Sequence, residues 1–142
     1  MKSPQIVVYE TDGWLAGQVR RLATDNGWLV RESRRPDACL RLLAEERPSV
    51  LLLKLDRDPH DGLALLAAIA ERAPDCSVVL VSDAKLEGSD QRGQLSALAF
   101  DLGARYFLFP PLQGPVIEDL AAGLLTAAIR RVVGHSAGKD DA

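Results

Sequence analysis

The chain has 142 residues, a length typical of one domain, and its 47% hydrophobic and 26% charged residues are ordinary for a protein with a single core. Its formal net charge of −3 at pH 7 offers no concentrated basic surface, which argues against nucleic-acid binding. No apolar run approaches the roughly 20 residues of a membrane span, and no signal-peptide core follows Met1, so we expect a cytoplasmic protein without a membrane segment.

Five short apolar runs alternate with five helical patterns. The runs cover residues 6–9, 29–31 (the weakest), 50–55, 78–82 and 106–109. The helical patterns cover residues 13–26, 36–47, 62–73, 95–102 and 115–133. Three runs are almost continuously apolar and rich in Val and Leu, which is typical of parallel strands covered on both faces. The order predicts an α/β fold: a doubly wound, five-stranded parallel sheet with five helices in a three-layer αβα sandwich.

Several residues are suited to the helix ends. Thr11 or Asp12 is a candidate cap for the first helix, and Asp61 for the third. Gly27 suits the position after the first helix, where a left-handed backbone is common. The fifth helix is expected to end near residue 133. Residues 1–134 then form the domain, and the polar residues 135–142 are expected to be a disordered tail.

The chain lacks the common signatures of catalysis and of cofactor binding. Its glycines form neither a dinucleotide-binding nor a P-loop pattern, and no histidine is placed to act as a base for Ser82. Cys39 and Cys76 lack the spacing of metal ligands and are expected to be free thiols, at least partly buried. We therefore expect no cofactor, no bound metal and no enzymatic activity.

Ligand sites in such a fold form outside the carboxyl ends of the strands. Seven residues stand at these ends and make up the candidate pocket: Glu10, Thr11, Asp12, Lys54, Asp56, Ser82 and Pro110.

Four segments resemble the receiver domains of response regulators. They are residues 5–9 before a polar cluster, Asp61-Gly62-Leu63 at the start of a helix, residues 79–82, and residues 103–112 with their Gly-Ala start and Pro-Pro-Leu end. The resemblance covers residues 5–133 and implies a CheY-like, flavodoxin-like fold and a role in two-component signal transduction. The connection after Ser82 is longer than is usual in the family, with residues 84–91 as the expected insertion.

The resemblance also implies a phosphorylation pocket, and this chain departs from it. In working receivers two acidic residues after the first strand bind Mg²⁺, and an aspartate after the third strand accepts the phosphoryl group. Glu10 and Thr11 match the first two positions, and Lys54 matches the aspartate. Ser82 keeps the family's hydroxyl. Pro110 replaces the family's lysine, before the bond to Pro111 that the family keeps cis; either isomer stays open here.

An ammonium group cannot accept a phosphoryl group as a carboxylate does. We therefore expect a degenerate pseudo-receiver in which Lys54 pairs with Glu10, and also with Asp56, in place of the metal. Asp12 could substitute for a lost acid. Two alternatives stay open: a sensor that binds an anion or small molecule around Lys54 and Ser82, and a residual receiver that is phosphorylated on Asp56 or Asp12.

The fifth helix carries apolar residues around most of its circumference, more than one buried stripe needs. The resemblance points to the same face, because receivers commonly dimerise or signal through the fourth helix, the fifth strand and the fifth helix. We expect protein partners, or a homodimer, at this face. Its candidate residues are Leu98, Tyr106, Phe107, Ile117, Leu120, Leu124, Leu125 and Ile129. Phe107 matches the aromatic position that reports activation in receivers, and we expect it to be fixed.

Overall fold

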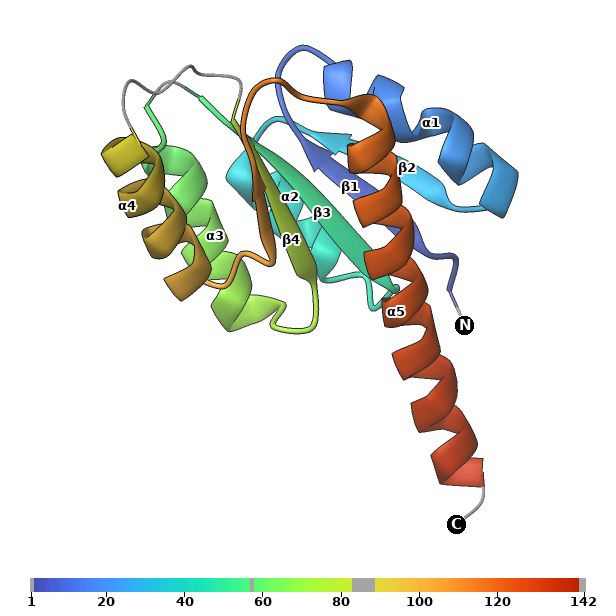
Figure 1. Cartoon of the computed structure of the whole chain (residues 1–142). Helices are drawn as coiled ribbons and strands as arrows, with labels where there is room; N and C mark the ends of the chain where they lie inside the picture. The colour runs from blue at the N-terminus through green and yellow to red at the C-terminus, as the bar shows by residue number, and fades with distance from the viewer. Residues whose placement is uncertain (1, 57, 83–88, 141–142) are drawn as a thin grey trace.

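The computed structural model describes residues 2–56, 58–82 and 89–140. The elements follow the predicted alternation (Figure 1). The strands are β1 (Gln5–Tyr9), β2 (Leu29–Ser33), β3 (Ser49–Leu55), β4 (Ser77–Ser82) and β5 (Tyr106–Leu108). The helices are α1 (Trp14–Asn26), α2 (Pro36–Leu43), α3 (His60–Arg72), α4 (Ser89–Asp101) and α5 (Gly114–Asp140). The strands form one parallel sheet in the order β2-β1-β3-β4-β5, which confirms the predicted fold class.

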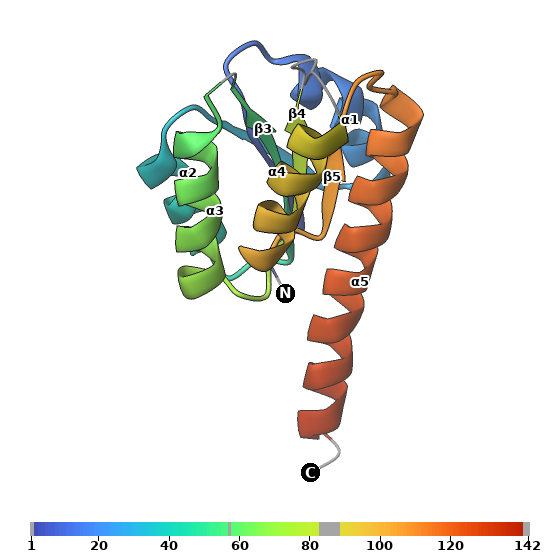
Figure 2. The same ribbon diagram turned by 60° about the vertical axis from the view of Figure 1, so that its left-hand side comes forward.

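Helices cover both faces of the sheet, and the alternation of side chains along each strand divides the core in two. Ile6, Val8 and Leu52 face α1 and α5, whereas Val7 and Leu53 face α2, α3 and α4. Figures 1 and 2 show α1 and α5 on one side of the sheet and α3 and α4 on the other. Both faces of the central strands are therefore dry, which is why their sequences are continuously apolar.

The helix ends refine the sequence predictions. Gly27 follows α1 in the left-handed conformation, as predicted, with φ of 68°. Asp61 lies in the first turn of α3 and is not its cap; the N–H of His60 donates to Oδ1 of Asp58 at 3.0 Å. Gly62 then packs directly against β3, where an added Cβ would meet Leu55 Cδ2. A glycine at this position lets α3 approach the sheet closely.

The last helix is longer than the sequence predicts. α5 continues through Gly134 to Asp140, so residues 135–140 are helical where we expect a disordered tail. The backbone of Gly134 stays helical, and no proline follows it to end the helix. Figures 1 and 2 show the carboxyl-terminal part of α5 projecting beyond the ends of the strands. The helix α4 also begins early, so residues 89–91 of the expected insertion belong to it, and residues 84–88 lie outside the described residues.

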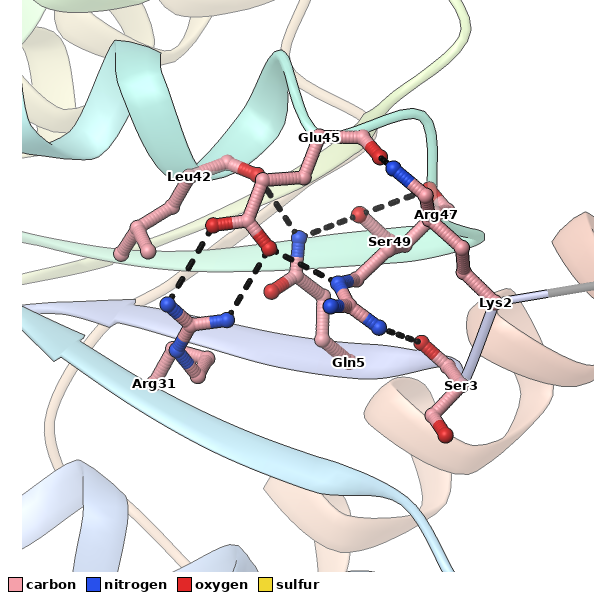
Figure 3. Close-up of polar contacts among 8 residues, drawn as sticks. All are labelled: Lys2, Ser3, Gln5, Arg31, Leu42, Glu45, Arg47 and Ser49. Atoms are coloured by element: carbon pink, nitrogen blue, oxygen red, sulfur yellow. Dashed lines mark hydrogen bonds and ion pairs between the residues drawn. The ribbon is translucent and has the colours of Figure 1, made fainter.

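Polar contacts tie the amino-terminal ends of the strands to the α2–β3 connection (Figure 3). Both carboxylate oxygens of Glu45 accept hydrogen bonds from Arg31, at 3.0 and 3.2 Å, and Arg47 Nε donates to Glu45 at 2.8 Å. The buried amide of Gln5 donates to the Leu42 carbonyl and to Ser49 Oγ. These contacts fix the register of β1, β2 and β3 at the end of the sheet opposite the candidate pocket.

Three further features answer questions that the sequence raises. The Pro110–Pro111 bond is cis. Cys39 and Cys76 are free thiols, the first fully buried and the second partly buried, as predicted. Among the described residues, no helix combines the length and the apolar character needed to cross a membrane.

Candidate functional site

Lys54 lies near the carboxyl end of β3, one residue before the strand ends. It follows Val50 and Leu52 at intervals of two residues, so it faces the same side of the sheet as they do, toward α1. Its Nζ lies 2.8 Å from Oδ2 of Asp12, which precedes α1. The lysine side chain is only 13% exposed, whereas that of Asp12 is 53% exposed. The two form an ion pair at the rim of the site.

The pair involves a different acid from the one that the sequence suggests. We expect Lys54 to pair with Glu10 and Asp56, but in the structure its ion pair is with Asp12. Both oxygens of Glu10 instead accept from the N–H of Leu15, at 2.8 and 2.9 Å, and one accepts from Ala16 at 3.3 Å. A helix start has N–H groups without partners within the helix, and a carboxylate stabilises them.

The two acids differ in protonation behaviour. Hydrogen bonding to Lys54 is the main cause that lowers the pKa of Asp12 to about 2, and the N–H of Trp14 contributes. Burial is the main cause that raises the pKa of Glu10 above 4.5; the N–H groups of Leu15 and Ala16 oppose it, and the neighbouring Asp12 adds to it. Asp12 is therefore the stable counter-charge of Lys54, and Glu10 is a buried helix cap.

This arrangement does not suit the Mg²⁺ ion that the receiver fold implies. Mg²⁺ needs an octahedral set of oxygen ligands, usually including one or two carboxylates. Here the oxygens of Glu10 accept from the α1 backbone, Asp12 binds an ammonium group, and Lys54 brings its own positive charge. Among the described residues, no three His, Cys, Asp or Glu side chains gather in a way that could hold a metal ion.

The structure brings together only some of the seven candidate residues. Glu10, Thr11, Lys54 and Asp56 line a cavity of about 520 Å³, to which Asp12, Ser82 and Pro110 do not contribute. Ser82 is buried at the end of β4, opposite Leu55 of β3. Pro110 is half-buried at the cis bond.

The cavity also contains residues that our sequence reasoning missed. Tyr9, Arg34, Asp61 and Leu40 contribute to its wall. Arg34 directly follows β2, so the rule about carboxyl ends of strands could have found it. The weak apolar run at 29–31 hid the true end of that strand at Ser33.

Seven of the eight predicted interface residues fall into three groups. Ile117 and Leu125 are fully buried in the core, so they are wrong as interface candidates. Three others are half-buried against the same core: Leu120, Leu124 and Ile129. Leu98 and Tyr106 are 46% and 43% exposed and can meet a partner.

Phe107 is half-buried, packs against the core on the side of α2, α3 and α4, and stacks on Phe109 with ring centroids 4.3 Å apart. The guanidinium of Arg92 lies over Phe109, 4.4 Å from the centre of its ring. That the Phe107 ring is fixed stays a prediction.

The Asp12–Lys54 pair predicts how stability depends on pH. Because the fold lowers the pKa of Asp12 from 3.8 to about 2, the contribution is present above 3.8 and is lost as the pH falls through about 2. Asp12 is half exposed, so we expect the contribution to be below about 1 kcal/mol. Denaturant unfolding across this range, compared with Asp12→Asn, measures it. Identical pH profiles for the two proteins would contradict the prediction.

Comparisons with known proteins bear on the fold. No protein-family model matches the sequence, and no curated protein matches it. NtrX from Brucella abortus, solved in complex with ADP, is 23% identical with a TM-score of 0.68 over 95% of this chain. The match covers 29% of the NtrX chain, so this chain spans less than a third of that protein.

Two smaller proteins match over nearly their whole length. A CheY-like response regulator receiver domain protein from Methanospirillum hungatei JF-1 has 13% identity and a TM-score of 0.70, covering 92% of this chain and 99% of its own. A protein described as adenylate cyclase from Rhodopirellula baltica has 13% identity and a TM-score of 0.69, covering all of both chains. Likenesses at such identities show the fold and leave the activity open. The chain therefore has the CheY-like receiver fold of response regulators.

Proposed function

We propose that this chain is a receiver-like module for protein–protein interaction in two-component-type signalling, and that it does not take up a phosphoryl group. The observation that carries the proposal is the Lys54–Asp12 ion pair, 2.8 Å between Nζ and Oδ2. Phosphoryl transfer to a receiver needs a carboxylate nucleophile and positive charge that neutralises the transferring group. Lys54 supplies a cation where the resemblance places the nucleophile, and Asp12 already neutralises that cation.

Phosphorylation tests this proposal directly. Incubation with acetyl phosphate and Mg²⁺ should add no phosphoryl group, as read by intact-protein mass spectrometry. In parallel, backbone amide NMR should show no saturable shift near Glu10, Lys54 and Ser82 on titration with Mg²⁺ and then beryllofluoride. A receiver with an intact aspartate is the positive control.

Phosphate incorporation would overturn the proposal. It would favour the residual receiver, and the variants Asp12→Asn and Asp56→Asn would then identify the acceptor. Lys54→Asp provides the complementary test: it removes the ammonium and restores a carboxylate, so it should gain affinity for Mg²⁺. Failure to gain it would show that Lys54 is not what keeps the metal out.

The proposed interaction face consists of α4, the edge strand β5, which α4 contacts, and the start of α5. Four large apolar side chains are exposed there: Leu98 (46%), Phe100 (50%), Tyr106 (43%) and Val116 (41%). Exposed apolar side chains of this size are candidate contacts for a partner. β5 has only three residues and is hydrogen-bonded on one side, so it is an edge strand that a partner can reach.

Sedimentation velocity over a range of protein concentrations tests whether the partner is a second copy. If the face forms a homodimer, Leu98→Ser with Tyr106→Ser should raise its dissociation constant by at least about tenfold, which is 1.4 kcal/mol. Val133→Ser, at an exposed site on α5, is the matched control and should leave the constant unchanged. A wild-type chain that stays monomeric throughout would exclude the homodimer and leave only other proteins as partners.

An anion-sensing role for the pocket has less support. The ammonium of Lys54 is engaged by Asp12, and the carboxyl groups of Glu10, Asp56 and Asp61 line the same cavity. An anion would meet more negative than positive charge there. We therefore do not carry this alternative further.

A further inference from the structure

The cavity that Glu10, Thr11, Lys54 and Asp56 line has the dimensions of a small-molecule site. Its volume of about 520 Å³ lies within the roughly 300–1,000 Å³ that is common for such sites. Apolar side chains from α2 (Leu40) and α3 (Leu65, Ala68) form part of the wall. These two helices cover the same face of the sheet and lie next to one another (Figure 2).

Opposite charges line this cavity from different elements. Asp56 and Asp61 come from the end of β3 and the start of α3, whereas Arg34 comes from the β2–α2 connection. All three are exposed. Within residues 2–56, 58–82 and 89–140, none of the three forms an ion pair or a side-chain hydrogen bond.

Two charged residues close to these in the sequence, Arg35 and Asp58, do have partners. Arg35 pairs with Asp37, with Nε and Oδ1 3.5 Å apart, and Asp58 accepts a hydrogen bond from the His60 N–H. Neither Arg35 nor Asp58 lines the cavity. Among the charged side chains that line the cavity, Glu10 accepts from the backbone of α1 and Lys54 pairs with Asp12, whereas Arg34, Asp56 and Asp61 form no ion pair within the described part of the chain.

Tyr9 lines the same cavity as the two aspartates. Burial is the main cause that raises the pKa of its phenol, and electrostatic interactions with Cys39, Asp56 and Asp61 add to it. The phenol adds a neutral hydrogen-bond donor to the carboxylates on that side.

We infer that this cavity binds a small zwitterion with an apolar body, of the class of apolar amino acids and short apolar peptides. The ammonium group of the ligand meets Asp56 and Asp61, its carboxylate meets Arg34, and its apolar part lies on Leu40, Leu65 and Ala68. Glu10 and Lys54 also line the cavity, but the α1 backbone engages the first and Asp12 engages the second. A molecule with both charges therefore complements the three charged side chains that remain. The inference goes beyond the proposed function and does not depend on it, because the charges it uses are those of Arg34, Asp56 and Asp61, whereas Lys54, which lines the same cavity, is engaged by Asp12.

Isothermal titration calorimetry with leucine and leucyl-leucine tests the ligand class. At least one of them should bind saturably. Its N-acetyl derivative lacks the ammonium group and its C-terminal amide lacks the carboxylate, and each should bind at least about tenfold more weakly. An absence of saturable binding by both zwitterions would overturn the inference, as would derivatives that bind as tightly as the parent.

Variants then show which side chain recognises each charged group of the ligand. Arg34→Gln should remove the preference for the carboxylate over the amide, and Asp56→Asn with Asp61→Asn should remove the preference for the free ammonium group. Ala68→Leu should block binding by filling the cavity with every charge kept. Arg35→Gln and Asp58→Asn are matched controls from the same two loops and should bind as the wild type does. Binding that responds equally to the controls would be general surface attraction and would overturn the inference.

Discussion

Leu125→Ala should lower the free energy of unfolding by about 2–5 kcal/mol and leave the oligomeric state unchanged. Leu125 is fully buried on the face of α5 that packs against the sheet, together with Ile117 and Ala121. Truncation removes buried apolar surface and leaves a cavity that the surrounding residues fill only in part. Denaturant unfolding measures the loss, and sedimentation velocity on the folded variant measures the oligomeric state.

Val133→Ala is the matched control on the same helix. Its side chain is 54% exposed, so the free energy of unfolding should change by no more than about 0.5 kcal/mol. If Leu125→Ala instead kept its stability and weakened self-association, Leu125 would be an interface residue, as the sequence suggests, and the packing of α5 described here would be wrong.

Glu10→Ala should cost about 1–3 kcal/mol of stability without any ligand present. The carboxylate accepts from the N–H groups of Leu15 and Ala16, and all three residues are buried. Its removal leaves donors at the start of α1 without an acceptor and away from water. Denaturant unfolding gives the total cost, and amide hydrogen exchange at Leu15 and Ala16 should accelerate before that of the strands.

Two substitutions separate capping from charge. Glu10→Gln keeps one acceptor oxygen and should lose less stability than Glu10→Ala. Glu71→Ala removes an exposed carboxylate from α3 and should have an effect close to zero. Equal losses for Glu10→Ala and Glu71→Ala would mean that Glu10 does not stabilise α1.

Much of this fold can be predicted from the sequence because burial on both faces leaves a direct mark on a strand. Residues 50–53 and 78–81 are continuously apolar, and the structure buries every one of them. β2 gives a weaker signal because it is an edge strand with charged residues such as Arg31 and Glu32. The end of α5 is harder still, because Gly134 can either stop a helix or continue it.

The site is less predictable, because the position of a charged residue in the sequence does not determine which hydrogen-bond or ion-pair partner it has in the fold. Lys54 can be placed near the end of β3 from the sequence alone, but the choice of Asp12 over Glu10 depends on where the N–H groups of α1 point. On α5, apolar residues surround most of the helix. The sequence therefore cannot separate Ile117 and Leu125, which are buried, from Val116, which is exposed.

Because Cys39 is deeply buried, its reactivity can report local opening of the core. Its side chain is fully buried, and burial raises the pKa of its thiol to about 11, so almost no thiolate exists at neutral pH. Alkylating reagents attack the thiolate, and they reach this sulfur only when α2 lifts away from the sheet or the chain unfolds. The rate of alkylation at Cys39, followed separately from that at the partly buried Cys76, would therefore report the opening of this side of the core without an engineered cysteine.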